Sequence, residues 1–410
     1  APLAVAHGFS RVYLLADTQT HALAGQQVVD LLEQVGIRTS LHVFAHATVE
    51  PDELAVGEAV LHFPHGCDAI IAIGSGTIND IGKVVAHTSK LPYWIVATAP
   101  SMDGYASGSS SMVRNQLKVT INTMCPQVII ADTDILIQAP DEMILAGIGD
   151  MCSKYISLLE WRVSNLVTDE YYCPVVADLM RAALDRCMAV APIARKREAH
   201  TVETIFEGLV IAGIAAAYAG ISRPASGVEH YVSHLLDMHA IGLGKQPHLH
   251  GIQVALGTVV ARKMWRFIAS LGPIEQQSAR TSYEHVDRES WYALLRETFG
   301  AGGESMVSEA KAEQRYAVVD HRKRLSRILE HREEIEELSR HLLPDEKEFV
   351  DLLRSIGLPT KFSELGVNQE LAHMIIRATK DVRWKYIAST LLDDLGHLSA
   401  CADVIVAEMA

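Results

Sequence analysis

The stretch DAIIAIGSGTINDIGK, residues 68–83, decides the fold class. Its run 69–73 has the length and β-branching of a buried parallel strand, and the glycines that follow open directly into a helical pattern. Gly74 and Gly76 can adopt backbone angles that a Cβ disfavours, and without side chains they would let a pyrophosphate approach the N–H groups of a helix N-terminus. The stretch therefore indicates a phosphate-binding corner, although strand-to-helix turns also use glycine for purely steric reasons.

The first third of the chain alternates short β-rich runs with helical periods. Strands are expected at 12–16, 41–44, 69–73 and 93–97, with helices that end near Leu32 and span 54–61. Such alternation is typical of right-handed β-α-β units and predicts a parallel sheet.

After about Asp141 the pattern changes to apolar residues three and four positions apart. This spacing predicts amphipathic helices, in particular over 143–161, 174–190, 316–342 and 346–356. A chain of 410 residues also exceeds the size at which a single core stops growing. We therefore expect an α/β domain with a parallel Rossmann-like sheet over residues 1–140 and an all-α domain over residues 141–410, with a hinge near Pro140.

Composition and charge argue against several kinds of partner. The 36 basic residues face 50 acidic ones, and the resulting net charge of −14 disfavours a nucleic acid or an anionic membrane as the main partner. The six cysteines include no C-x-x-C pair, which suits a reducing compartment. The longest apolar segment, 209–219, is too short to span a bilayer and is expected to be a buried helix. Because residues 1–10 lack the charged start of a signal peptide, we expect a cytoplasmic protein without membrane insertion.

Candidate metal ligands occur in the helical part. His230 and His234 in GVEHYVSH are four residues apart, so they share one face of a helix. His250 follows 20 positions after His230 where a loop enters a helix, and Asp150 in AGIGDMCSK is expected near the start of the first long helix. One carboxylate and two imidazoles would leave metal positions open for substrate, as catalysis requires. Among 19 histidines, such a pair also arises readily by chance.

The chain resembles the superfamily of iron-containing alcohol dehydrogenases and dehydroquinate synthases in five motifs, which occur in the superfamily's order and spacing: GSGTINDIGK, TAPSMDGYASGSS, GDMCSK, GVEHYVSH and HGIQVALG. Within it, the chain is most similar to the sn-glycerol-1-phosphate dehydrogenases, over about residues 12–257. The loop 98–110 is the most specific part of the match, and beyond residue 260 the similarity consists only in helical character. The resemblance implies a dehydroquinate synthase-like fold and a metal-dependent, NAD(P)-linked oxidoreductase.

For the cofactor, the resemblance implies that the glycine corner cradles the pyrophosphate of NAD(H) or NADP(H). The residues so implied are Gly74, Ser75, Gly76, Thr77 and Ile78, with Asp17 at the end of the first strand and Thr98, Ser101 and Ser107 along the nicotinamide side. Ser75 stands where the superfamily usually has a glycine, but its hydroxyl can also bind phosphate. Asp17 is equally suited to a turn, and serine and threonine are common in loops.

For the metal, the resemblance implies Asp150, His230 and His250 as ligands of one divalent cation, for which zinc, nickel and iron are all suitable. It assigns substrate binding and catalysis to Asp103 and His234 together with Asp150, although Asp103 in Met-Asp-Gly could merely form a turn. To these residues we add Lys118 and Lys154 as candidates for a substrate phosphate; the alternative is that both are solvated surface lysines.

The implied reaction is the reversible reduction of dihydroxyacetone phosphate, a small phosphorylated triose, to sn-glycerol 1-phosphate. One alternative is a glycerol or other polyol dehydrogenase. Another is an NAD- and metal-dependent lyase or cyclase of the dehydroquinate synthase type, but that family has a glutamate at the position of Asp150. The choice between NAD and NADP stays open, and an exposed apolar patch on the helical domain would favour a homodimer.

Overall fold

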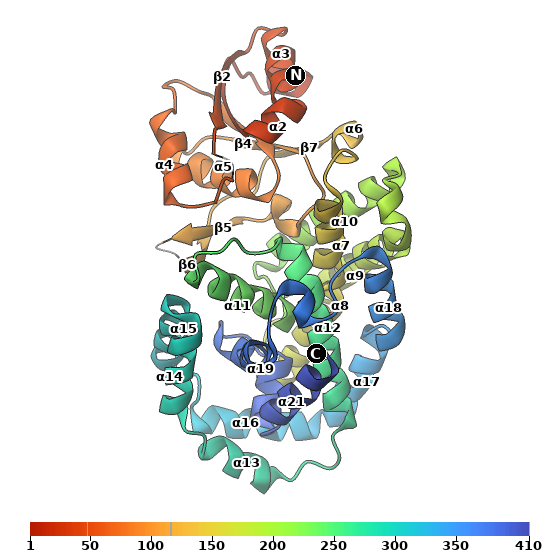
Figure 1. Cartoon of the computed structure of the whole chain (residues 1–410). Coiled ribbons are helices and arrows are strands. Elements are labelled where there is room, and N and C mark those ends of the chain that lie inside the picture. The colour runs from red at the N-terminus through yellow and green to blue at the C-terminus, as the bar shows by residue number, and fades with distance from the viewer. Residues whose placement is uncertain (47, 115–116, 410) are drawn as a thin grey trace.

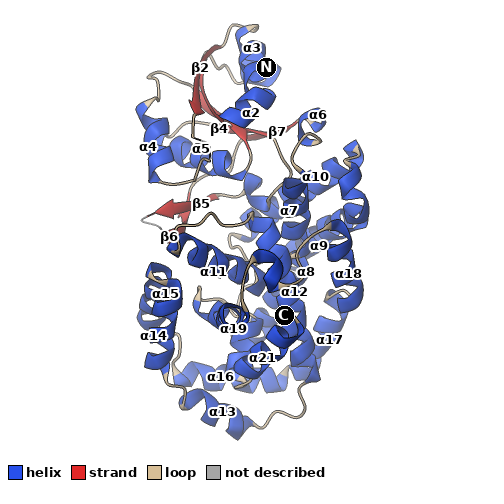
Figure 2. Cartoon of the chain, in the orientation of Figure 1, coloured by secondary structure: helices blue, strands red, loops and turns tan. Residues whose placement is uncertain are grey.

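A parallel β-sheet forms the N-terminal part of the computed structural model, and helices make up most of the remainder (Figure 1 and Figure 2). The structure describes residues 1–46, 48–114 and 117–409. Within these ranges, five strands pair in parallel in the order β2-β1-β3-β4-β7. Their bounds are Arg11–Asp17 (β1), Arg38–Phe44 (β2), Ala69–Gly74 (β3), Tyr93–Ala97 (β4) and Val128–Ala131 (β7). The predicted fold class is thereby confirmed.

Helices follow the strands in the predicted alternation. They are α1 (Pro2–Ala6), α2 (Thr18–Thr20), the π-helical turn η1 (His21–Gly25), α3 (Gln26–Glu33), α4 (Glu53–Leu61) and α5 (Gly76–Ser89). Every residue of β3 and β4 is buried, because a strand in the middle of a parallel sheet is covered on both faces. The strands predicted from the sequence fall on β1 to β4, whereas β7, the short apolar run VIIA, was not predicted.

An antiparallel pair of strands, β5 (Ser109–Arg114) and β6 (Leu117–Asn122), links the sheet to the helices and was also not predicted. The serine-rich sequence of β5, SSSMVR, lacks the alternation of apolar and polar residues that marks a strand, whereas β6, LKVTIN, does alternate, and this signal was missed. In Figure 1 the pair lies between the sheet and helix α11 (Val228–Gly242), and β6 contacts α11. The hairpin therefore brings residues of the N-terminal part, Lys118 among them, to the helical part.

The helical part begins after Pro140. Its first helices are α7 (Asp141–Cys152), α8 (Lys154–Thr168), α9 (Pro174–Val190), α10 (Ala199–Ala219), α11 and α12 (His250–Ser270). The later ones are α13 (Gln276–Glu284), α14 (Arg288–Phe299), α15 (Ala301–Ala312), α16 (Val318–Glu330), α17 (Arg332–Leu342), α18 (Glu346–Ile356), α19 (Gln369–Ala378), α20 (Ala388–Asp394) and α21 (Leu398–Glu408). Two short elements precede this part, the 3-10 turn η2 (Asp103–Ala106) and the helix α6 (Thr133–Leu136). Within it lie the 3-10 turns η3 (Ala191–Lys196), η4 (Phe362–Leu365) and η5 (Thr379–Asp381).

Three helix predictions need correction. The predicted helix 143–161 is interrupted at Ser153, where α7 ends and α8 begins, and the predicted helix 316–342 is interrupted at His331. The apolar segment 209–219 is part of the 21-residue helix α10, which by length and composition could cross a membrane. Half of the most apolar window of α10 is buried, and the helix packs on α7, α9 and η2, which favours the interpretation as a core helix.

Helix α12 approaches both α7 and α11 so closely that glycine is needed at the contacts. A Cβ on Gly149 would overlap the carbonyl oxygen of Gly251, and a Cβ on Gly251 would overlap that of Ala146. In the same way, a Cβ on Gly257 of α12 would overlap the carbonyl oxygen of Glu229 on α11. Backbone atoms cannot move aside as flexible side chains can, so these glycines set the distances among the three helices.

We predict that Gly257→Ala destabilises the metal-free protein by at least about 2 kcal/mol, because the added methyl group overpacks a contact between two helix backbones. The matched control is Gly57→Ala in α4, where a Cβ would meet nothing within 4 Å. Removing a glycine from this open helix position should stabilise the protein by about 0.5–1 kcal/mol. Urea denaturation measures the free energy of unfolding of both variants. Equal changes in this free energy would contradict the proposed packing.

Candidate active site

One carboxylate and two imidazoles meet where α7, α11 and α12 come together. Asp150, His230 and His250 each offer a ligand atom, and these atoms all lie within 4.8 Å of one another. Within the described residues, this is the one group of three or more metal-ligating side chains that meets that distance. Asp150 lies near the end of α7 rather than near the start of the first long helix, because Pro140 and the acids after it already begin that helix. Thus the structure brings the three predicted ligands together.

The two imidazoles are oriented for metal binding. His230 places Nε2 3.6 Å from Asp150 Oδ1. His250 Nδ1 lies 3.2 Å from Ser233 Oγ, and that hydroxyl donates to Gln253 Oε1 at 2.7 Å. Because the only hydroxyl hydrogen of Ser233 is directed to Gln253, His250 Nδ1 must be the donor to Ser233, which leaves the lone pair on His250 Nε2. The orientation of His250 therefore suits a ligand that coordinates through Nε2.

The protonation states of Asp150 and His250 also fit a cation, whereas burial would lower the pKa of His230 but its hydrogen bonds with Asp150 and Glu229 raise it. Burial, and then the charge of His230, hold the pKa of His250 well below its usual value, so the ring is neutral near pH 7. Burial alone would raise the pKa of Asp150, but Lys154 and the hydrogen bond with His230 outweigh it and hold this pKa below the usual range. An ionised carboxylate and neutral imidazole nitrogen form a donor set that binds zinc, nickel and iron.

A buried lysine connects two carboxylates beside these ligands. Lys154 Nζ donates to Asp103 Oδ2 at 2.6 Å and to Asp150 Oδ1 at 2.9 Å, and it also contacts Ser153 Oγ and the Ala225 carbonyl oxygen. These four acceptors occupy the three N–H groups of an ammonium that is fully buried, so the structure contradicts the interpretation of Lys154 as a solvated surface lysine. The Asp103 N–H also donates to Asp150 Oδ2 at 2.8 Å, which ties the loop of Asp103 to the ligand set.

His234 lies one helical turn beyond His230, and its ring centroid is 6.4 Å from that of His250. Burial lowers the pKa of His234 well below its usual value, and the positive charges of Lys118 and Arg383 lower it further. Lys118 on β6 pairs with Asp237 on α11, and Arg383 donates to Thr120 Oγ1 at 3.0 Å. Two cations from distant parts of the sequence therefore stand near His234, of which only Lys118 was predicted.

The glycine corner connects β3 to α5 as predicted, but without the backbone angles expected of its glycines. Neither Gly74 nor Gly76 has the positive φ that the sequence suggested. At Gly74 a Cβ would come within 2.6 Å of the side chain of Ile78, so the glycine is needed for close packing of strand and helix. At Gly76 a Cβ would meet only Met102, at 3.4 Å. Ser75 is the N-cap residue of α5, and Thr77 lies in its first turn, where backbone N–H groups are free for an anion.

The other predicted cofactor residues surround this corner. Asp17 ends β1 and accepts a hydrogen bond from the Thr20 N–H at 2.7 Å, so it does serve as a helix cap. Ser101 Oγ lies 2.6 Å from Ser75 Oγ, and the Thr98 N–H donates to the Gly74 carbonyl oxygen. These contacts hold the loop after β4 against the glycine corner.

Lys83 has a structural role that its sequence context did not suggest. Its fully buried ammonium donates to the Gly104 and Ser109 carbonyl oxygens and to Ser107 Oγ, at 2.5–3.1 Å. Ser107 is thereby held between Lys83 and the backbone of its own loop. The sequence offered only a lysine in an amphipathic helix, which normally points to solvent.

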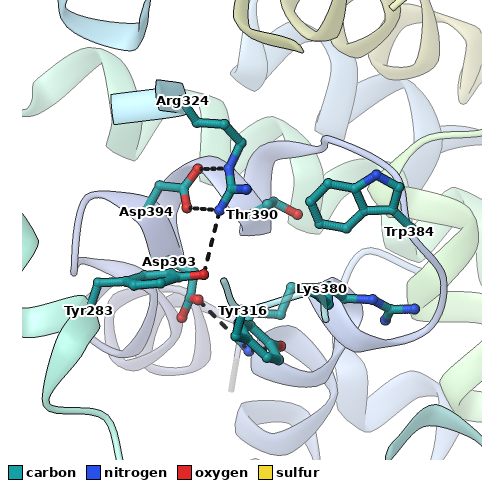
Figure 3. Close-up of a pocket in the computed structure, with 9 residues that line it drawn as sticks. Tyr283, Tyr316, Arg324, Lys380, Trp384, Thr390, Asp393 and Asp394 are labelled. Carbon is teal, nitrogen blue, oxygen red and sulfur yellow. Dashed lines mark hydrogen bonds and ion pairs between the residues drawn. The ribbon is translucent and has the colours of Figure 1, made fainter. Parts of the chain in front are cut away.

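A further polar pocket in the helical part has a different character (Figure 3). Arg324 makes two hydrogen bonds of 2.7 Å to the carboxylate of Asp394, and its guanidinium also faces the Tyr283 hydroxyl. Lys380 donates to the Tyr316 hydroxyl. The charged groups of this pocket pair with one another, which is typical of a structural ion-pair network, and it shares no residue with the ligand set.

The sheet with its glycine corner and the helical part with its ligand set define a class of protein, the iron-containing alcohol dehydrogenases. A family model of that description matches residues 1–140. A probable glycerol dehydrogenase from Sinorhizobium meliloti has a similar fold, with a TM-score of 0.61 over 98% of this chain and 94% of that chain at 16% identity.

Curated relatives identify the family within this class to which the chain belongs. The chain is 29% identical to glycerol-1-phosphate dehydrogenase (NAD(P)+) from Bacillus licheniformis over 395 residues, which cover 95% of this chain and 84% of the relative. It is 32% identical to the enzyme of the same name from Geobacillus thermodenitrificans over 287 residues, which cover 68% of this chain and 71% of the relative. The chain belongs to the glycerol-1-phosphate dehydrogenase family.

We predict that Gly76→Val weakens NAD(H) binding at least about tenfold, because the branched side chain would fill the space in which a pyrophosphate approaches the start of α5. The fold should tolerate the change, since Gly76 has no positive φ and an added Cβ meets only Met102 at 3.4 Å. Calorimetry measures the affinity, and thermal unfolding of the unliganded variant checks the fold. Gly76→Ala serves as the smaller control, and unchanged affinity in the valine variant would exclude a cofactor at this corner.

Proposed function

We propose that this chain catalyses the reversible, metal-dependent reduction of dihydroxyacetone phosphate to sn-glycerol 1-phosphate with NAD(H) or NADP(H). The observation that carries the proposal is the convergence of Asp150, His230 and His250 within 4.8 Å, with Asp150 and His230 buried and His250 partly buried. The names of the curated relatives support the substrate and the cofactor. In this proposal residues 1–140 bind the cofactor, residues 141–410 bind metal and substrate, and the enzyme acts in the cytoplasm.

The residues of the chain supply binding, orientation and proton transfer. When bound, a divalent cation at Asp150, His230 and His250 supplies Lewis acidity, and the reduced nicotinamide supplies the hydride. His234 is neutral near pH 7 because its pKa is lowered by burial and by nearby cations, so it can accept the alcohol proton during oxidation. During reduction the same ring would return a proton taken from solvent to the substrate oxygen.

Asp103 would orient the substrate toward His234 and the proposed metal ligands. Burial and the neighbouring Asp150 raise the pKa of Asp103, while Lys154 opposes that rise. The ammonium of Lys154 keeps both carboxylates together at distances of 2.6 and 2.9 Å, although two negative charges would otherwise repel each other. We therefore assign Lys154 to the support of Asp103 and Asp150, and the substrate phosphate to Lys118 and Arg383 beside His234.

Removal of metal tests the reaction type. Dialysis against a chelator should abolish turnover, and one equivalent of a divalent cation should restore it, because the chain would otherwise lack a Lewis acid at the reacting carbonyl. His250→Ala should lose both metal and activity. Full turnover by metal-free protein, verified by elemental analysis, would contradict the proposal. If product forms without oxidation or reduction of a stoichiometric amount of nicotinamide, the result would instead indicate a lyase or cyclase.

Removal of the substrate phosphate tests the substrate. Dihydroxyacetone should have a kcat/KM lower by at least about a hundredfold than dihydroxyacetone phosphate, since charge-assisted contacts and their orienting effect are lost together. Lys118→Met should lower kcat/KM for the phosphorylated ketone about tenfold and leave that for dihydroxyacetone nearly unchanged.

The control for Lys118→Met adds Asp237→Asn, so that no carboxylate is left without its partner. Chiral analysis of the product completes the test. Formation of the 3-phosphate enantiomer, or equal efficiency with both ketones, would overturn the substrate assignment and leave a metal-dependent polyol dehydrogenase.

A further inference from the structure

Glu229, the residue before the proposed ligand His230, is a fully buried carboxylate. Its Oε1 accepts a hydrogen bond from the Gly227 N–H at 2.6 Å and lies 2.9 Å from His230 Nδ1. Its Oε2 has no hydrogen-bond partner within the described ranges. Burial of a carboxylate is unfavourable unless its oxygens are satisfied, so this placement requires an explanation.

A second buried carboxyl group, that of Glu160 on α8, lies beside Glu229. A Cβ on Gly227 would come within 2.5 Å of Glu160 Oε2 and 2.7 Å of Glu229 Oε2, so both oxygens converge on the space that this glycine leaves open. Glu160 accepts hydrogen bonds from the Val228 and Ala388 N–H groups, both at 2.9 Å. It is therefore fixed by the backbone at the start of α11 and at the start of α20, and within the described residues no hydrogen bond or ion pair joins it to a proposed ligand.

Burial, followed by the charge of Glu229, raises the pKa of Glu160 to about 8. Glu160 is therefore protonated near neutrality, and of the two acids Glu229 is the one that contacts the His230 ring.

We propose that Glu229 is a positioning residue for His230, an inference that rests on the proposed metal site. By accepting the Nδ1 hydrogen, its carboxylate selects the tautomer in which Nε2 bears the lone pair. Nε2 is the ring nitrogen on the side of Asp150, at 3.6 Å from its Oδ1. The negative charge of Glu229 also makes the imidazole a stronger donor to a cation.

Metal affinity of the whole protein tests this role without recourse to activity. Metal-free wild type, Glu229→Gln and Glu229→Ala are titrated with Zn²⁺ in competition with a chromophoric chelator. Glu229→Ala should weaken Zn²⁺ binding about 10–100-fold, the usual cost of losing such a partner of a metal-binding histidine. Glu229→Gln should weaken it less, because the amide oxygen can still accept the Nδ1 hydrogen while the charge is lost.

Thermal unfolding of the metal-free proteins separates positioning from simple structural support. Metal-free Glu229→Gln should unfold at the same temperature as wild type or higher, because the change removes the charge of one of two adjacent buried acids. A merely structural role would lower stability and metal affinity together, which would overturn the proposal.

Glu160→Gln is the matched control, since it alters an equally buried acid and keeps the contact between Glu229 and His230. Its Zn²⁺ affinity should stay within about threefold of wild type. An equal loss in Glu160→Gln and Glu229→Gln, or unchanged affinity in both Glu229 variants, would overturn the role of Glu229 alone. A wild-type protein that binds no Zn²⁺ at all would overturn the metal site of the proposed function as well.

Discussion

The close backbone approach of α7, α11 and α12 is the constraint on which the candidate active site depends. Asp150, His230 and His250 lie on three different helices, and their ligand atoms meet only because these helices touch through Gly149, Gly251 and Gly257. A side chain at any of these contacts would force the helix axes apart, and the ligands would move with them. The glycines that neighbour the ligands in sequence are therefore as much a part of the site as the ligands themselves.

A second constraint is the need to keep charges paired where side chains are buried or partly buried. The chain has a net charge of −14, yet the groups around the ligand set include the cations of Lys154, Lys118 and Arg383. Buried charges are costly unless they are paired with good geometry, and Lys154 meets this condition through its contacts with Asp103 and Asp150. The local arrangement thus provides positive charge that the overall composition lacks and that the proposed phosphorylated substrate would require.

Much of this organisation could be predicted from the sequence. The branched run before Gly74 and the turn into a helix indicated the parallel sheet, because strand and helix periodicities are strong local signals. The spacing of His230 and His234 placed them on one helix face, and the similarity to a known superfamily selected Asp150, His230 and His250 as the ligands among the candidates. The structure brings Asp150, His230 and His250 together, while their binding of a metal stays a prediction.

The remaining features depend on contacts between residues that are far apart in the sequence. Nothing near Lys154 signals that its ammonium lies between Asp103 and Asp150, and nothing near Arg383 signals that it approaches Thr120 of the hairpin. Gly74 and Gly76 were expected to have unusual backbone angles, which they do not have. Gly74 is instead needed for close packing against Ile78, and Gly76 leaves open space near Met102. Local sequence specifies the elements, whereas these roles follow from the way the elements pack.

The most direct test of the account is an anomalous diffraction map, recorded at the absorption edge of the metal that copurifies with active enzyme. We predict one strong peak about 2.0–2.2 Å from Asp150 and from one ring nitrogen each of His230 and His250, at the distances usual for zinc. A peak bound by other residues, or the absence of any peak in crystals of fully active enzyme, would contradict the account.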